Sequence, residues 1–255
     1  MPELTPVPNS TSYATASAGL SQIERVVDTY VAPTKTFMDI RRNASWWMPF
    51  LIGVIVSYMF AFALQREVGF QKVAENSMQG NAQMQEQMST KSPAEVHQIY
   101  ANIAKVTRIM TYSAPIMTLI FAMIASGIFM ACFNFGLGAQ VPFSQYLAVW
   151  FYAGLPLIIK WILASITLFA GLGADQFNIQ NPVGTNIGFY LSQDAPKWLS
   201  TLLSSADIFT VWTVILLVIG YATVAKVKRS SAAFVVVGWW ALAVLGMTVM
   251  AAARG

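Results

Sequence analysis

The chain has 255 residues, of which 56% are hydrophobic and 10% are charged, and its formal net charge is +4. Water-soluble domains place about a quarter of their residues in charged types, so this composition excludes a water-soluble protein. The basic residues are scattered along the sequence, which favours membrane topology over nucleic-acid binding as their explanation. The single cysteine, Cys132, excludes an intrachain disulfide framework and a Cys-based metal cluster.

The N-terminal part of the chain predicts a tail followed by two short helices. Residues 1–20 are rich in Pro, Ser, Thr and Ala, which predicts a disordered tail rather than a signal peptide. Residues 21–45 predict amphipathic helices, because Ser21 and Glu24 have capping-box spacing and Pro33 interrupts the first helix. Such helices lie at the membrane interface or, alternatively, pack on the cytoplasmic end of the protein's own bundle. The interfacial residues are Lys35, Arg41, Arg42, Trp46 and Trp47.

Residues 46–252 contain five apolar stretches, each long enough for a helix to cross about 30 Å of hydrocarbon. They run from Trp46 to Leu64, Ser113 to Phe133, Leu147 to Ala170, Ala206 to Ala225 and Ala233 to Ala252. Continuous apolar runs favour helices, because a transmembrane strand would alternate polar and apolar residues. The sequence therefore predicts an all-α polytopic integral membrane protein, a bundle of five transmembrane helices with amphipathic interfacial helices.

The connections between these stretches are polar or rich in turn-forming residues. Ser92, Pro93 and Glu95 predict the start of a long helix that begins outside the membrane and enters the second span. The glycines of FNFGLG predict a turn between the second and third spans. We interpret the connection from Gly171 to Ser205 as an ordered surface loop anchored by aromatic residues. The alternative is a loop that dips into the outer end of the bundle.

The distribution of Lys and Arg predicts the orientation in the membrane. One basic group precedes the first span, and a second, Lys226, Lys228 and Arg229, fills the connection between the fourth and fifth spans. An even number of spans separates the two groups, so they lie on the same side, which the positive-inside rule assigns to the cytoplasm. We therefore expect a cytoplasmic N-terminus and an external C-terminus.

Lys160 is the residue that most needs an explanation. From Ile109 to Ile159 the chain has no Asp, Glu, Lys or Arg, and Lys160 then falls inside the third apolar stretch. A charge at that depth costs at least ~2.5 kcal/mol on insertion scales, so it should face the bundle interior or water. It could form an anion or lipid head-group site or pair with Asp207. It could also snorkel to the interface, or bond carbonyl groups freed by Pro156.

The other candidate polar residues are less unusual. Asp207 is predicted to cap the N-terminus of the fourth span, a role that can coexist with an ion pair. Asn134 lies in the turn after the second span, and Asn181 and Asn186 belong to the NPVGTN segment of the outer connection. No catalytic, cofactor-binding or metal-binding residue is predicted, because the only histidine, His97, cannot supply a His-metal cluster or a Ser-His-Asp set.

Several segments resemble, in order, those of a known family. They are KTFMDIRRNASWWMPFLIG, FNFGLGAQVPFSQYLAVWFYAGLPLIIKWIL, FNIQNPVGTN, PKWL and LSSADIFTVW. Together they are similar to the bacterial branch of the Yip (Ypt/Rab-interacting protein) domain family, over about Thr34 to Ala252, with NPxxTN and DxFTxW as the more specific elements. The resemblance implies about five spans, a cytoplasmic N-terminus and a bacterial inner membrane. It transfers no catalytic residue, because none is established for the family.

These observations predict a non-enzymatic protein that organises the membrane or interacts with proteins and lipids. The expected partners are the lipid bilayer and other membrane proteins, without nucleic acid. The alternative is a transporter of an ion, small molecule or lipid, in which Lys160 and Asp207 line the path and Pro156 supplies the broken helix that many transport sites use.

Overall fold

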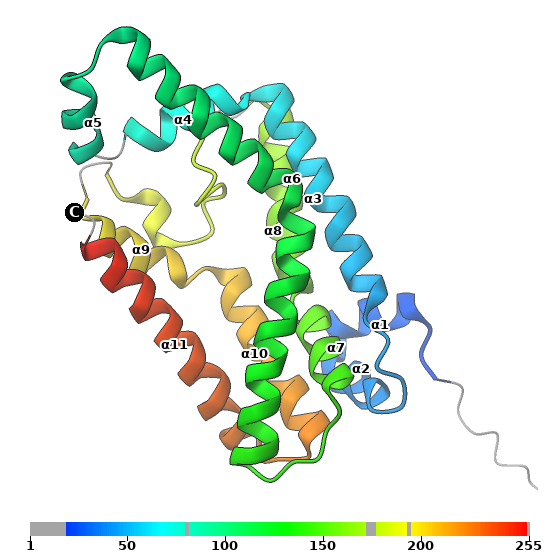
Figure 1. Ribbon diagram of the computed structural model, residues 1–255. Helices are drawn as coiled ribbons and strands as arrows, with labels where there is room; N and C mark the ends of the chain where they lie inside the picture. The colour runs from blue at the N-terminus through cyan, green and yellow to red at the C-terminus, as the bar shows by residue number, and fades with distance from the viewer. Residues whose placement is uncertain (1–18, 80–81, 172–176, 193–194, 254–255) are drawn as a thin grey trace, which may run out of the picture.

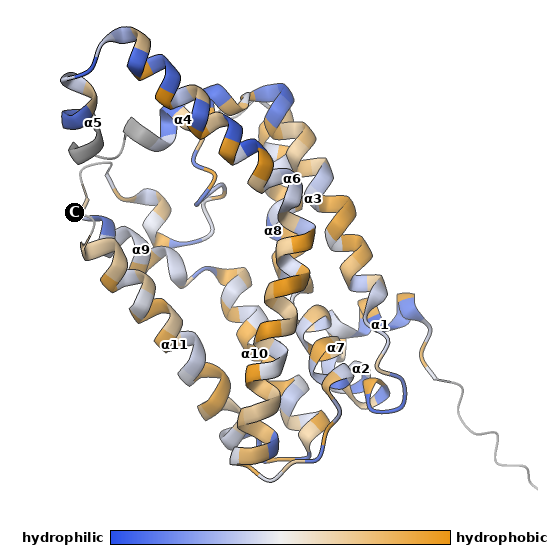
Figure 2. Cartoon of the chain, viewed as in Figure 1, coloured by the Kyte–Doolittle hydropathy of each residue, from blue (hydrophilic) through white to orange (hydrophobic). Residues whose placement is uncertain are grey.

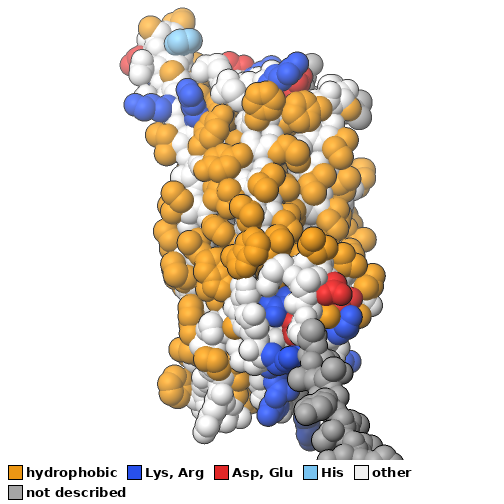
Figure 3. All heavy atoms as spheres, turned by 90° about the vertical axis from the view of Figure 1, so that its right-hand side faces the viewer, with side chains coloured by type: hydrophobic (Ala, Val, Ile, Leu, Met, Phe, Trp, Pro, Cys, Tyr) orange, Lys and Arg blue, Asp and Glu red, His pale blue; other side chains and the backbone are white. Residues whose placement is uncertain are grey.

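The computed structural model describes residues 19–79, 82–171, 177–192 and 195–253. The predicted disordered tail therefore lies almost entirely outside the described residues. Within them the secondary structure is helical, without a strand, and the long helices run along one common direction (Figure 1). Apolar side chains cover the middle of the face drawn in Figure 3, and charged side chains gather toward its two ends.

Five spans in the described chain are long and apolar enough to cross a membrane, which confirms the predicted fold class. The first is α3 (Trp47–Glu67), and the second is α6 (Pro93–Ala131), which continues into a π-helical turn, Cys132–Gly136. The third consists of α7 (Phe143–Ala153) and α8 (Leu155–Phe169), and the last two are α10 (Ile208–Ala225) and α11 (Arg229–Ala253). The apolar residues follow these helices in Figure 2.

The third span is divided at Gly154, where α7 ends and α8 begins. Pro156 occupies the first turn of α8, a position at which its missing N–H costs no helical hydrogen bond. The amide of Gly154 still donates to the carbonyl of Trp150, and the amide of Leu157 donates to the carbonyl of Gly154. The break between α7 and α8 is therefore a tight turn in which the amide and the carbonyl of Gly154 are both hydrogen-bonded.

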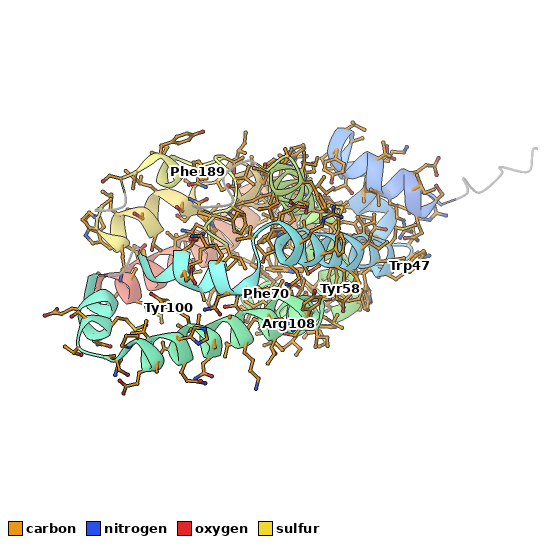
Figure 4. The ribbon with its side chains drawn as sticks, turned by 90° about the horizontal axis from the view of Figure 1, so that it is seen from above. Trp47, Tyr58, Phe70, Tyr100, Arg108 and Phe189 are labelled. Carbon is orange, nitrogen blue, oxygen red and sulfur yellow. The ribbon has the colours of Figure 1, made fainter. Side chains whose placement is uncertain are left out.

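The connections contain short helices that were not predicted from the sequence. Between the first two spans lie α4 (Phe70–Gln79) and α5 (Ala82–Ser89), and α4 packs against α6. The connection before α10 contains a 3-10 helix, Ile187–Tyr190, and α9 (Lys197–Ser205), which packs against α11. The predicted start of the second long helix is confirmed, because Ser92 and Glu95 form a capping box at α6. Seen from above, Phe189 lies on the opposite side of the bundle from Phe70, Tyr100 and Arg108 (Figure 4).

The two amphipathic helices near the N-terminus pack on the bundle. Ser21 and Glu24 form the predicted capping box of α1 (Gln22–Val31), and α2 (Pro33–Ile40) starts at the predicted proline. Both helices contact α7, and α2 packs closely on α10. The side chains of Phe37 and Ile40 are fully buried there. Packing against the bundle is thus observed for α1 and α2, and their place relative to the lipid surface stays a prediction.

The α2 helix approaches α10 closely because α10 has no side chain at the contact. A Cβ atom on Gly220 would lie 3.0 Å from Cε1 of Phe37 and 2.5 Å from Cγ1 of Val149 on α7. Aromatic rings of Phe129, Phe133, Tyr146 and Tyr221 pack beside this contact in the largest buried cluster. The core thus joins α2, α6, α7 and α10. It lies toward the end of the molecule that carries Arg41, Arg42 and Lys226, which we call the basic end.

Candidate functional site

The structure brings Lys160 and Asp207 together. Lys160 lies on α8, and Asp207 is the N-cap of α10, which packs against α8. Nζ of Lys160 lies 3.1 Å from Oδ2 of Asp207, and the side chains are 15% and 1% exposed, respectively. Of the alternatives open for Lys160, the ion pair is the one that the structure contains. The pair also meets the condition that a charge at this depth faces the bundle interior.

Asp207 is also the cap that the sequence predicted. Its Oδ1 accepts a hydrogen bond of 2.9 Å from the amide of Phe209, which satisfies a free donor of the first helical turn. Its Oδ2 accepts from the hydroxyl of Thr185 and, at 3.4 Å, from Nδ2 of Asn186. The amide of Ile208 donates at 3.3 Å to the carbonyl of Thr185. The carboxylate therefore bonds to α8, to α10 and to the NPVGTN segment at once.

The two candidate asparagines of this segment bond to each other. Nδ2 of Asn181 lies 3.1 Å from Oδ1 of Asn186, and Nδ2 of Asn186 lies 2.7 Å from Oδ1 of Asn181. Asn181 also donates to Oγ of Ser204 on α9, and Asn186 accepts from the amide of Phe189. We call these connected side chains the Asp207 network; it consists of Lys160, Asn181, Thr185, Asn186, Ser204 and Asp207.

The network ties the connection between α8 and α10 into the bundle. Asn186 is buried, and Phe177, earlier in the same connection, is buried against Phe60 of α3 and beside Trp161 of α8. Tyr190 remains exposed, so the aromatic residues do not all anchor the connection. Of the two alternatives for this connection, a loop that dips into the bundle fits the observed burial better than a surface loop. Irregular backbone beside membrane helices is tolerated when it is buried in protein, as it is here.

Asn134 lies apart from the Asp207 network, at the basic end of the molecule. Its Nδ2 donates at 3.0 Å to the carbonyl of Val141, and its Oδ1 accepts from the amide of Val141 and the hydroxyl of Tyr146. These bonds close the turn between α6 and α7, which the glycines of FNFGLG had predicted. Asn134 is thus satisfied within its own turn.

A second buried ion pair was not predicted. Nη2 of Arg25 lies 2.7 Å from Oδ2 of Asp39, and both residues are almost fully buried. Nη1 of Arg25 donates at 2.9 Å to the carbonyl of Asn43, so the guanidinium joins α1 to α2 and to the chain after it. The hydroxyl of Tyr152 on α7 donates to Oε1 of Gln22. The pair lies in a polar segment of sequence, where charged residues are usually solvated, so little in the sequence points to it.

The contact between α9 and the 3-10 helix gives a test of the Asp207 network. A Cβ on Gly188 would lie 2.1 Å from Oγ and 2.7 Å from the amide nitrogen of Ser204. We expect Gly188→Ala to push α9 away, weaken the bond between Ser204 and Asn181, and cost about 1–3 kcal/mol in the free energy of unfolding. Equilibrium unfolding in mixed detergent measures this loss. Gly127→Ala is the control, because no atom lies within 4 Å of its added Cβ. An equal effect of both variants would contradict the predicted close contact.

The comparison with known proteins gave one match. A sequence model of the Yip1 domain matches residues 27–250, which include α2 through α10, the Asp207 network and nearly all of α11. No curated protein and no solved structure matched the chain.

Proposed function

The chain belongs to the Yip1 domain family, and from this premise we propose that it is a non-enzymatic protein that organises the membrane through contacts with lipid. We place it in the bacterial branch of the family and in the inner membrane. The observation that carries the proposal is the arrangement of α1, which buries Arg25 and Thr29 and leaves Ile23, Val27 and Val31 exposed.

The outward face of α1 is an apolar stripe formed by Ile23, Val27 and Val31. These residues are 69%, 53% and 74% exposed, and they recur at a helical spacing of four. The opposite face holds Arg25 and Thr29, which are both buried, and Arg25 bonds to Asp39 of α2. A helix in water would place these residues the other way round, whereas a helix at the acyl boundary presents its apolar face to lipid. Lipid is therefore the occupant that we propose for the stripe.

The Asp207 network supports a structural role more than a transport role. Lys160 and Asp207 neutralise each other, and the carboxylate accepts three further hydrogen bonds from neighbouring groups. Two open surface cavities of the described chain, one beside Phe234 and one beside Lys226, are lined by other residues than Lys160 and Asp207. A transporter would need these charges to face a hydrated path. Within the described residues, no group of three or more His, Cys, Asp and Glu is placed to hold a metal ion.

The cytoplasmic N-terminus is part of the same proposal. Arg41 and Arg42, which precede the first span, line one cavity together with Lys226, which follows the fourth. Basic residues from two distant connections thus share one end of the bundle, which supports a cytoplasmic assignment for that end. The external C-terminus then follows from the five spans.

Lipid contact by α1 can be measured with fluorescent probes. In a Cys132→Ser background, we expect a bimane probe on Val27→Cys to be quenched by nitroxide-labelled acyl chains in reconstituted vesicles, because Val27 faces lipid. The control is the same probe on Lys35→Cys, since Lys35 is 58% exposed and pairs with Asp28 in the polar part of this surface. Quenching by aqueous iodide instead of lipid at Val27 would overturn the proposal. Anion or lipid flux that depends on Lys160 would favour the transporter.

A further inference from the structure

The basic end of the bundle contains a cavity that none of the preceding roles uses. It has a volume of about 470 Å³ and lies between α2, the start of α7 and the end of α10. Nine residues line it: Met38, Arg41, Arg42, Gln140, Val141, Pro142, Gln145, Val224 and Lys226. The lining includes three cationic side chains and two amides but no acidic side chain. This combination is suited to an anion.

The cations of the cavity come from parts of the chain that are far apart in sequence. Arg41 and Arg42 follow α2, whereas Lys226 is the C-cap of α10. Among the described residues, the side chains of Arg41 and Lys226 have no ion-pair partner, and Arg42 lies 4.0 Å from Asp39. The lining contains no acidic side chain, so Arg41 and Lys226 give the cavity a net positive charge.

The backbone around the cavity is fixed. Lys226 has φ 55°, the left-handed conformation that ends a helix, and its amide donates to the carbonyl of Ala222. Nε2 of Gln145 donates at 3.2 Å to the carbonyl of Arg41, which ties the start of α7 to the end of α2. Two of the basic residues thus project from bonded backbone, which lowers the entropy lost when they hold a ligand.

The cavity also lies where lipid head groups lie. The span α10 ends beside it, at Ala225, and the third span begins beside it, with α7 at Phe143. Its lining combines apolar side chains, Met38, Val141 and Val224, with the cations above. A phosphate group with a glycerol or acyl part attached matches both, because the phosphate is anionic and the attached part is less polar. Arg and Lys near a membrane surface attract anionic lipids, and Arg binds phosphate oxygens in bidentate geometry.

We propose that this cavity binds a phosphate-bearing anion, with Arg41 and Lys226 as the principal ligands. The proposal goes beyond the function above, because phosphate binding does not depend on lipid contact by α1. The phosphate has two possible sources, an anionic lipid head group and a free phosphate from the cytoplasm. Both sources use the same positive cavity, and the experiment separates them.

The experiment uses the full-length protein in detergent and measures bound lipid by native mass spectrometry. We expect phosphatidylglycerol to be retained in preference to phosphatidylcholine. The double variant Arg41→Gln, Lys226→Asn should weaken phosphatidylglycerol binding by about tenfold or more, since two surface cations are lost. Asn is chosen at position 226 because it tolerates the left-handed conformation. The matched control is Lys228→Gln, Arg229→Gln, which removes the same charge from the same basic end but does not line the cavity.

A second arm measures thermal stability with inorganic phosphate and without lipid. Stabilisation by phosphate that the cavity variant loses, without a preference for phosphatidylglycerol, would assign the site to a free anion. The cavity variant alone should unfold at the same temperature as the parent, because both substituted side chains are exposed. Equal losses in the cavity and control variants, or no binding of either phosphate source, would overturn the proposal. The Val27 probe reads the α1 surface separately, so failure of one proposal is distinguishable from failure of the other.

Discussion

Asp207→Asn should destabilise the protein by about 3–5 kcal/mol, the usual cost of leaving one member of a buried ion pair without its partner. Asn retains the size of Asp and serves equally well as a helix N-cap, so the cap at Phe209 can be kept. Its amide group cannot replace the second oxygen, so the loss reports the charge together with the bonds from Thr185 and Asn186. Lys160, whose side chain is 15% exposed, would then hold an ammonium without its counter-charge beside α10. Equilibrium unfolding in mixed detergent micelles measures the change.

The double variant Lys160→Met, Asp207→Asn is the matched control. Replacing both members of a buried pair is often close to neutral, so we expect the double variant to regain most of the stability that either single variant loses. The resulting coupling energy isolates the pair from its surroundings. A loss below about 1 kcal/mol in Asp207→Asn would contradict the buried pair and would instead indicate a solvated Lys160.

Arg25→Met should release α1 from α2. The substitution leaves the carboxylate of Asp39 buried and removes the hydrogen bond to the carbonyl of Asn43. We expect the free energy of unfolding to fall by about 3 kcal/mol or more, because a buried charge loses its partner, as at Asp207. Because α1 packs mainly on α2 and has few contacts with the rest of the bundle, the loss should appear as local opening. Hydrogen exchange of residues 22–40 measures this opening directly.

Lys35→Met is the comparison for Arg25→Met. Lys35 also forms an ion pair, with Asp28 at 2.8 Å, but it is 58% exposed. An exposed pair contributes little to stability, so the protection of residues 22–40 should change little. Equal exchange in both variants would show that burial of Arg25 is not what holds the two helices. If the double variant Arg25→Met, Asp39→Leu regains the protection of residues 22–40, the result would support the ion pair.

The five spans were predictable because hydropathy depends on composition over about 20 residues, and tertiary contacts do not change it. The short helices α4, α5 and α9 were not. The segments of α4 and α9 are too polar or too short to stand out, and each is stabilised by a neighbour, α6 for α4 and α11 for α9. Phe70, Val73 and Ala74 of α4 are buried in that contact. Helices of this length are marginal alone, so a sequence pattern gives little warning of them.

The candidate site was predictable to the extent that charge in an apolar setting is conspicuous. Lys160 stood out for that reason, and its pairing with Asp207 was one of several alternatives. Thr185 was missed, because a neutral hydroxyl carries no such signal, although it neighbours Asn186 in the NPVGTN segment. Arg25 was missed for the opposite reason, since a charge among polar residues looks solvated until the fold places Asp39 beside it.

The order of the two charges along the chain has a consequence for biogenesis. The ribosome completes the third span, with Lys160, before it synthesises Asp207. That span also has the lowest mean hydropathy of the five, 1.8. Its partition into the bilayer therefore depends on its own apolar residues. They must offset the cost of the Lys160 ammonium, because the counter-ion Asp207 has not yet been translated. The NPVGTN segment, which emerges between the two, already holds the hydroxyl and amide donors that receive the carboxylate when it arrives.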